Sequence, residues 1–436
     1  MGQAGAAASQ ENVRTKEKKV GAKKEGIGAL WQISAFRQML ISRVLSNFGD
    51  SIDVIAYSWL VYMLTGSKLL MGTLFAVGTL PTIILGTFAG VLVDRWSNKT
   101  TVIASALIRG SIVAFTALLY VTGAIEVWHL FVLSLLLSSV AAFSNPAMMS
   151  WMPRVLPKEK LVSANSLAAS AAQTARLGGL AFSGALIAWA GLGGAFGLNA
   201  LMLLLSAFVL GRIPSLHARR EERPAGTKAP GFWKELGSGM SYLYGQKVLL
   251  LIVGLAGFLN FAISPMEALE AAYVGELLKQ GPAALSVLSI GMAAGMIASG
   301  LLLGQIGGRV RKGTLMIAGF LFMGLSIGLL LFPPSASSPQ LALIFATALY
   351  FLLGLSVNMI ASPTTSYLME QTPPEMLGRV GALFNTLCLS AFPIGSALSG
   401  ALAESLELKT LYPIMGALVI LPAVILFAVP KMRRLR

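Results

Sequence analysis

The sequence is poor in charged residues, cysteine and histidine. Charged residues make up 12% of the 436 positions, whereas soluble domains carry about 25%. The single cysteine, Cys388, excludes an intramolecular disulfide and a cysteine metal cluster. Two histidines, His129 and His217, do not form a metal or haem site by themselves, so we expect no metal and no cofactor. With 56% hydrophobic residues, the composition favours an integral membrane protein.

Motifs of common enzyme classes are also absent from the sequence. There is no GxxxxGK[ST] loop for ATP phosphates. There is no HExxH pair and no set of nucleophile and base. We therefore expect a protein that is not an enzyme.

Long hydrophobic runs occupy most of the chain. A helix needs about 20 apolar residues to cross the hydrocarbon core of a bilayer. Twelve stretches fit this requirement, namely 38–64, 69–93, 100–121, 128–151, 161–190, 195–213, 248–272, 284–306, 314–332, 341–369, 379–403 and 412–429. The predicted fold class is therefore an all-α integral membrane protein with twelve transmembrane helices.

Polar segments between these runs indicate the domain organisation. We expect a disordered basic tail with an interfacial segment (1–37), a first half (38–213), a linker (214–247), a second half (248–429) and a basic tail (430–436). The start of the basic tail lacks the apolar core of a signal peptide. The linker is too short for a soluble signalling domain, which disfavours the alternative of a non-transporting sensor or scaffold.

Lysine and arginine are distributed very unequally across the predicted membrane. One side has three of them, Lys68, Lys279 and Lys409, and three more lie inside spans, Arg43, Arg109 and Arg176. All the others fall on the side that carries both termini, which places the termini in the cytoplasm. The net charge of +15 is therefore a topology signal. We therefore expect the protein to lie in a lipid bilayer, and we do not expect it to bind nucleic acid through its positive charge.

Two segments recur at an interval of about half the chain. GVLVDRWSNK at 90–99 is matched by GQIGGRVRK at 304–312. Asn-Pro at 145–146, followed by PKEKL, is matched at nearly the same interval by Ser-Pro at 362–363, followed by PPEML. Two pseudo-repeated six-helix halves are typical of secondary transporters, whose binding site lies at the interface of the halves near the midplane.

The first repeated segment carries a family resemblance. Its GxxxDRxxxK pattern resembles the signature loop of the major facilitator superfamily and is formed by Gly90, Asp94, Arg95 and Lys99. The Gly49-Asp50 pair, TGSK after the first span and ANS at 164–166 are similar to the branch of macrolide-efflux and enterobactin-export proteins. The resemblance runs from about Arg37 to Val429. It implies alternating access, and export driven by a proton gradient across a bacterial inner membrane.

The same loop implies a gate at the cytoplasmic side. By resemblance to the family, it is a latch that holds this side closed against the start of the eleventh span. Asp94 can accept hydrogen bonds at a helix amino terminus, and Gly90 permits close backbone approach. The second copy contains Arg309 and Lys312 but has Gly308 in place of the acid, so we expect a weaker latch there. A topology role for Arg95 and Lys99 is the alternative.

Four ionisable residues fall in the middle of predicted spans. At 1.5 Å per residue, Asp50 and Asp53 lie about 18 and 23 Å along the first span, while Arg109 and Arg176 lie about 14 and 22 Å along the third and fifth. The two aspartates, at positions i and i+3, share one helix face. Burial disfavours a charged carboxylate, so we expect this pair to exchange protons, with either arginine as competitor. The alternative is a static ion pair that orients the spans.

Two further acids, Glu267 and Glu270, lie on the seventh span, the counterpart of the first. They are about 28 Å or more along this span, which predicts a position near the outer surface. We expect them either to couple protons or to serve as an outer gate or solvated group. The fifth span carries GLAFSG, from Gly179 to Gly184, which resembles the antiporter motif of drug exporters with Leu180 in place of its proline.

The leading functional hypothesis is a monomeric, proton-coupled exporter of a macrolide-type or siderophore-like small molecule. Uptake, or export of an anionic metabolite that binds Arg109 and Arg176, is the alternative within transport.

Overall fold

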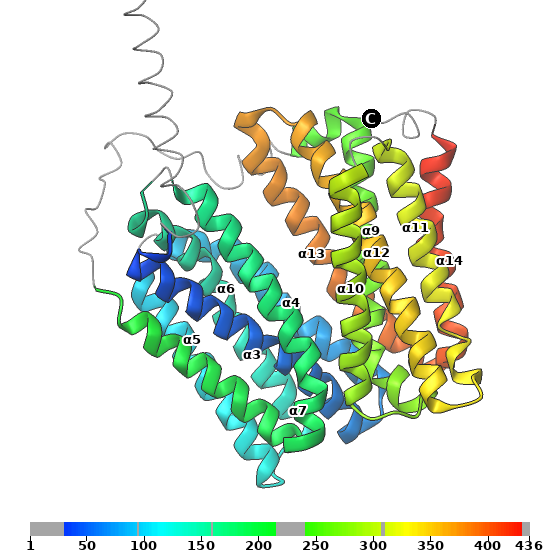
Figure 1. Ribbon diagram of the computed structural model, residues 1–436, viewed down its shortest axis with the longest axis horizontal. Coiled ribbons are helices and arrows are strands. Elements are labelled where there is room, and N and C mark those ends of the chain that lie inside the picture. The colour runs from blue at the N-terminus through cyan, green and yellow to red at the C-terminus, as the bar shows by residue number, and fades with distance from the viewer. Residues whose placement is uncertain (1–29, 94–95, 158–159, 215–239, 307–309, 430–436) are drawn as a thin grey trace, which may run out of the picture.

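The computed structural model describes residues 30–93, 96–157, 160–214, 240–306 and 310–429. These residues form long helices joined by short turns (Figure 1). The elements are α3 (Ser34–Thr65), α4 (Lys68–Val93), α5 (Asn98–Val121), α6 (Val127–Val155), α7 (Leu161–Gly211), α9 (Lys247–Ala272), the π-helical η2 (Tyr273–Leu277), α10 (Ala283–Ile306), α11 (Lys312–Leu329), the short η3 (Pro333–Ser335), α12 (Pro339–Gln371), α13 (Pro374–Ser405) and α14 (Leu408–Ala428). The terminal tails and most of the linker, which the sequence predicted to be polar, lie outside the described residues.

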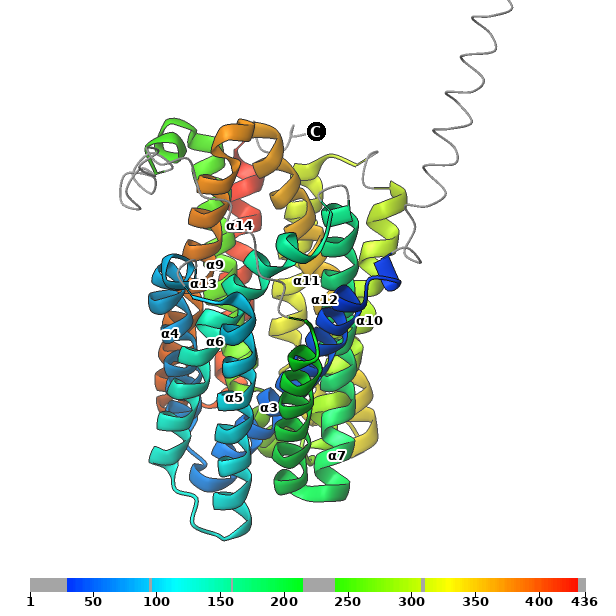
Figure 2. The same ribbon diagram turned by 90° about the vertical axis from the view of Figure 1, so that its left-hand side faces the viewer.

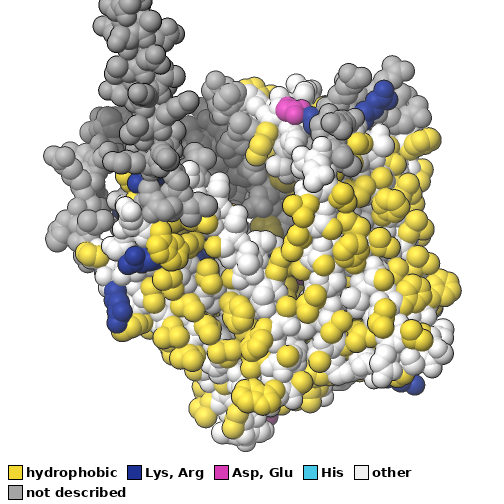
Figure 3. Space-filling model, viewed as in Figure 1, with side chains coloured by type: hydrophobic (Ala, Val, Ile, Leu, Met, Phe, Trp, Pro, Cys, Tyr) yellow, Lys and Arg dark blue, Asp and Glu magenta, His cyan; other side chains and the backbone are white. Residues whose placement is uncertain are grey.

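Ten of the described helices are long and apolar enough to cross a membrane. Their outer faces carry large apolar side chains that are mostly exposed, such as Leu301 and Ile344, which are 66% and 65% exposed. Figure 3 shows hydrophobic side chains spread over much of the visible face. Apolar surface of this extent marks an interaction site, and a lipid bilayer matches it.

The helices α3 and α7 differ from a single, continuous apolar helix that crosses a membrane once. α3 is 32 residues long but contains Arg37, Arg43, Asp50 and Asp53, and it is not among the ten apolar helices. α7 is 51 residues long and is interrupted at Gly191, whose φ of 70° is non-helical. Glycine adopts this conformation at no steric cost, so the chain reverses there and α7 consists of two arms (Figure 2).

The helices are arranged in two bundles (Figures 1 and 2). In the N-terminal bundle, α3 and α5 pack against α7, and α4 and α5 pack against α6. In the C-terminal bundle, α10 packs against α12, α11 against α14, and α9 against α13. Between the bundles, α4 packs against α13 and α7 against α10.

The two bundles are tied together at one end, which we call the far end because it is opposite the start of α3 and the end of α14. Lys68 at the start of α4 forms an ion pair of 2.9 Å with Glu276 of η2. Glu404 of α13 accepts hydrogen bonds of 3.3 Å from the Ser67 hydroxyl and from the Leu69 backbone N–H. The start of α4 therefore binds an acid from each of two elements of the opposite bundle.

Candidate functional site

A cavity of about 270 Å³ lies between the two bundles. Its lining is predominantly apolar, and four methionines contribute to it: Met266, Met292, Met296 and Met323. Methionine side chains adapt to irregular shapes because they are unbranched and polarisable. The cavity is therefore suited to a hydrophobic molecule of no single shape.

Few polar side chains face this cavity, and three of them are ionisable acids or bases of the membrane interior. Arg176 and Gln173 come from the first arm of α7, and Glu267 and Glu270 come from α9. Among the described residues, Arg176 and Glu267 form no ion pair or hydrogen bond, although both line the cavity. Their charged groups are thus available to a bound molecule.

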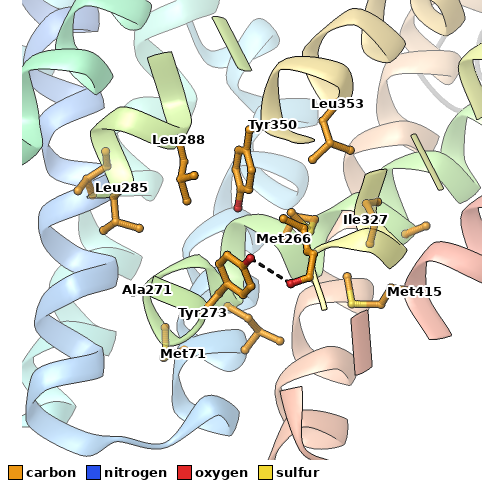
Figure 4. Packing of buried hydrophobic residues seen from close by; sticks show 14 of the residues in the cluster. Met71, Met266, Ala271, Tyr273, Leu285, Leu288, Ile327, Tyr350, Leu353 and Met415 are labelled. Carbon is orange, nitrogen blue, oxygen red and sulfur yellow. Dashed lines mark hydrogen bonds between the residues drawn. The ribbon is translucent and has the colours of Figure 1, made fainter. Parts of the chain in front are cut away.

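Tyrosines surround Glu270 on the side of the C-terminal bundle. Tyr350 of α12 lies beside Glu270 and also lines the cavity. In Figure 4 the Tyr350 hydroxyl points toward Tyr273, and the dashed line marks the 3.1 Å hydrogen bond from the Tyr273 hydroxyl to the Leu330 carbonyl. The ring of Tyr273 packs edge-on against Tyr412 of α14, with centroids 5.0 Å apart. Glu270 therefore has neutral aromatic hydroxyls around it.

A second group of ionisable residues lies within the N-terminal bundle. Arg109 of α5 forms an ion pair with Asp50 of α3. The Arg109 side chain is 15% exposed and that of Asp50 is 39% exposed. Neither residue lines the cavity between the bundles, so this pair links two helices of one bundle.

Asp53 lies next to this ion pair, but among the described residues it forms no ion pair itself. Its neighbour across the bundle is Asn199, on the second arm of α7. The Asp53 Oδ1 atom and both polar atoms of the Asn199 amide are buried without a hydrogen bond. One helical turn further, the Tyr57 hydroxyl forms a 3.2 Å hydrogen bond with Thr116. Asp53 is thus a carboxylate with Asn199 as a neutral polar neighbour and with Asp50 and Arg109 as charged neighbours.

The predicted middle layer of four residues is divided between two places. Asp50, Asp53 and Arg109 lie together, whereas Arg176 lies in the cavity with Glu267 and Glu270. The expected depth of the two glutamates, near the outer surface, stays a prediction, and the structure adds that both line this cavity. Distance along a helix gives depth but not the direction of a side chain, and both glutamates are directed to the cavity.

The structure describes only some of the residues that were predicted to form the cytoplasmic gate. Asp94, Arg95 and Arg309 lie outside the described residues, and Gly90 lies in the last turn of α4. Lys99 donates hydrogen bonds of 2.6 and 3.3 Å to the carbonyls of Ile213 and Gly211, at the end of α7. In the second copy, Lys312 forms an ion pair of 2.5 Å with Glu370 of α12. These bonds of the two lysines stay within one bundle.

Loss of the Lys99 ammonium is expected to destabilise the N-terminal bundle. Cations satisfy the last carbonyls of a helix, and hydrogen bonds from charged groups contribute about 1.5–3 kcal/mol. Because Lys99 is partly exposed, we expect Lys99→Met to cost about 1 kcal/mol, measured as a lower Tm of the purified protein in detergent. Lys99→Arg, which keeps the donors, should retain the wild-type Tm, and an unchanged Tm for Lys99→Met would contradict this role.

The GLAFSG segment of α7 packs against both bundles. A Cβ at Gly179 would lie 2.9 Å from the Cβ of Ser51 in α3. The Gly184 N–H donates a 2.6 Å hydrogen bond to the hydroxyl of Ser286 in α10, which itself donates to the Leu180 carbonyl at 2.7 Å. This segment therefore supplies a contact between the bundles beside the cavity, where Leu180 is part of the lining.

Several polar residues of these sites were not identified from the sequence, and three of them make direct contacts with predicted site residues or segments. They are Asn199, Ser286 and Tyr350, each a polar residue inside an otherwise hydrophobic span. A polar residue inside a hydrophobic span could have indicated a site residue, but small and polar residues are also frequent at helix contacts in membranes. The property alone does not separate a site residue from a packing residue.

Comparison with known proteins identifies a family. The sequence model of the Major Facilitator Superfamily matches residues 39–395. The chain is 27% identical over 376 residues to macrolide efflux protein A of Streptococcus pyogenes, covering 85% of this chain and 90% of that protein. It is 25% identical over 414 residues to the multidrug efflux pump Tap of Mycolicibacterium fortuitum, covering 91% of this chain and 96% of that protein.

The fold is also similar to that of solved structures. The crystal structure of a bacterial homologue of the iron transporter ferroportin, in an inward-facing state, matches with a TM-score of 0.68. The match covers 92% of this chain and 98% of that chain, at 18% identity. At this identity the likeness concerns the fold alone.

Proposed function

Because this chain belongs to the Major Facilitator Superfamily and is thus a multi-pass membrane transporter and not an enzyme, we propose that it exports a drug-like, macrolide-type molecule in exchange for protons. The cavity between the bundles is the observation that carries this proposal. The names of the relatives, macrolide efflux protein A and a multidrug efflux pump, support the direction and the cargo class. The cargo occupies the cavity in contact with its methionines and with Arg176, Glu267 and Glu270.

Proton coupling is assigned to the carboxylates of the membrane interior. Ionisable groups at this depth are costly and mark ion pathways. Protonation of Asp53 from outside, and of Glu267 or Glu270 in the cavity, favours release of the cargo and return of the empty transporter. Arg109 and Arg176 are the cations that compete with the proton for these carboxylates.

The proposed topology has twelve membrane spans in two pseudo-repeated halves. α3 and the two arms of α7 complete the set, because each arm of α7 has at least about 20 residues and so about 30 Å of length. The positive-inside distribution of lysine and arginine places both termini in the cytoplasm. The far end, where the bundles are tied together, then faces outward, and the cargo enters from the cytoplasm or the inner leaflet.

The direct test is proton movement evoked by cargo in proteoliposomes. We expect erythromycin, as the macrolide probe, to cause proton release through the wild-type protein. Asp53→Asn should reduce the proton flux at least about tenfold, the effect of losing about 1.4 kcal/mol of coupling free energy. Glu407→Gln, at an exposed position before α14, is the matched control and should keep the wild-type flux. Proton release equal to wild type in Asp53→Asn would refute the assignment of this residue.

A second candidate is export of an anionic, siderophore-like molecule. The free guanidinium of Arg176 in the cavity favours it. Two carboxylates in the same lining oppose it, because like charges repel at close range. In the same assay, a catecholate siderophore that evokes proton release where erythromycin does not would select this candidate.

A further inference from the structure

The two acidic pairs occupy equivalent positions in the sequence repeat. Asp50 and Glu267 are separated by the same interval as Asp53 and Glu270. This interval also separates the proline inside α6, Pro146, from the proline inside α12, Pro363. α3 and α9 are the first long helices of their bundles, and each carries two acids at positions i and i+3, which lie on one helix face.

The first acid of each pair faces an arginine. Asp50 forms an ion pair with Arg109 in the N-terminal bundle. Glu267 lies within electrostatic range of Arg176, with which it shares the cavity lining. The arginines themselves are not repeat-related, because the repeat interval leads from them to a serine and a proline, Ser326 and Pro393. The same charge arrangement is therefore built with different partners in the two bundles.

The second acid of each pair faces neutral polar groups. Around Asp53 these are Asn199 of α7 together with Tyr57 of α3 and its partner Thr116 of α5, and the charged neighbours are Asp50 and Arg109. Asp53 Oδ1 is buried without a hydrogen bond.

The surroundings of Glu270 follow the same rule. Its neutral neighbours are Tyr350 of α12, Tyr273 of η2 and Tyr412 of α14, and its charged neighbours are Glu267 and, beyond it, Arg176. Among the described residues, Glu270 forms no ion pair.

Each group thus contains two carboxylates and one arginine. If all three were charged, one negative charge in each group would be uncompensated. An uncompensated buried charge costs several kcal/mol, and the group neutralises instead. A proton on the second acid restores neutrality in each group.

We propose that the transporter has two separate proton sites, Asp53 within the N-terminal bundle and away from the cargo cavity, and Glu270 in the lining of that cavity, and that it moves two protons per cargo molecule. The number of protons moved per cargo molecule rests on the proposed function, whereas the two protonation sites themselves do not depend on transport. Cargo in the cavity contacts Glu270 directly. It affects Asp53 only through the movement of α3 and α7, because Asp53 is not part of the cavity lining.

Labelling with dicyclohexylcarbodiimide tests the two sites without any cargo. This apolar reagent adds to protonated carboxyl groups in apolar surroundings, and the adduct is located by peptide mass spectrometry. We expect adducts on Asp53 and Glu270 but not on Asp50 and Glu267. Excess erythromycin should protect Glu270 and leave Asp53 labelled. Asp53→Asn should keep the Glu270 adduct and Glu270→Gln the Asp53 adduct. Labelling of one site alone, or of all four acids equally, would overturn the proposal.

The proton number is tested by accumulation at equilibrium. With the membrane potential clamped to zero and a pH difference of one unit, two protons per cargo support a cargo gradient of about 100-fold and one proton supports about tenfold. We expect about 100-fold for the wild type and about tenfold or no accumulation for Asp53→Asn and Glu270→Gln. A wild-type gradient of about tenfold would refute two coupled protons. If no erythromycin moves while both adducts form, the exporter assignment fails and the two sites stand.

Discussion

Asp50→Asn is expected to lower the free energy of unfolding by about 2–3 kcal/mol, because it leaves the mostly buried guanidinium of Arg109 without its counter-ion. Breaking a fully buried ion pair costs about 3–5 kcal/mol. The lower figure applies because the Asp50 side chain is 39% exposed and solvent screens part of the interaction. Arg109 Nε is already buried without a hydrogen bond, and the other nearby carboxylate, Asp53, forms no ion pair with this guanidinium among the described residues. Denaturant unfolding of the purified protein in detergent micelles measures the effect.

The partner variants separate an ion pair from a simple loss of packing. Arg109→Gln alone should cost less than Asp50→Asn, because the remaining carboxylate is the more exposed member of the pair. The double variant Asp50→Asn with Arg109→Gln should recover at least about 1 kcal/mol relative to the sum of the single variants. Strictly additive losses would mean that the two side chains do not interact, and this account of the N-terminal bundle would be wrong.

Gly72→Val is expected to open the far end of the transporter. Gly72 is at the start of α4, and a Cβ added there would meet the Ser396 carbonyl oxygen and lie 2.9 Å from the Gly400 Cα of α13. Overpacking of this kind costs about 1–3 kcal/mol. The cost falls on the conformation in which the bundles touch at this end. We therefore expect the population with an open far end to rise about tenfold or more.

Alkylation of an introduced cysteine measures this opening. Cys388→Ala removes the native thiol, and Ser289→Cys places a thiol in the cavity lining. In intact cells, a membrane-impermeant maleimide should label Ser289→Cys about tenfold faster when Gly72→Val is present. Ser405→Cys, at the exposed end of α13, should react equally fast in both backgrounds. An unchanged rate at Ser289→Cys would show that contact at Gly72 does not keep the far end closed.

Most of the fold followed from the sequence because long apolar runs permit few alternatives in a bilayer. Helices such as α11 and α14 were predicted from hydrophobic length alone, and the structure has helices at both places. The turn between the fifth and sixth spans was placed at 191–194, and the non-helical residue is Gly191. The ends of the helices were less predictable: α12 runs to Gln371 and α13 begins at Pro374, so the polar ends of these helices extend beyond their apolar cores.

The candidate site was predicted only in part because side-chain direction depends on contacts between distant helices. The sequence indicated which acids and arginines lie within the spans, and the structure describes all seven. It did not indicate that Arg109 pairs with Asp50 while Arg176 shares a cavity with Glu267, since all four arginine–aspartate combinations had compatible depths. Asn199, which lies five predicted spans beyond Asp53 in the sequence, approaches the first span only because the chain reverses at Gly191.

The far-end contacts were also beyond sequence reasoning. The pair of Lys68 and Glu276 joins residues from opposite halves of the chain, and Lys68 had been noted only as one of three basic residues on the outer side. Its role as a tie between the bundles requires that α4 and η2 approach each other. The arrangement of the bundles, rather than a local motif, determines this contact.

The central claim is that the cargo binds in the cavity between the bundles. Protection of Ser289→Cys by cargo tests it most directly, in purified protein on the Cys388→Ala background. We predict that saturating erythromycin slows alkylation of Ser289→Cys by at least about tenfold and leaves Ser405→Cys unaffected, because a bound molecule excludes the reagent from the lining. An alkylation rate at Ser289→Cys that erythromycin does not change, under conditions where its binding to the same protein is measured, would contradict the account.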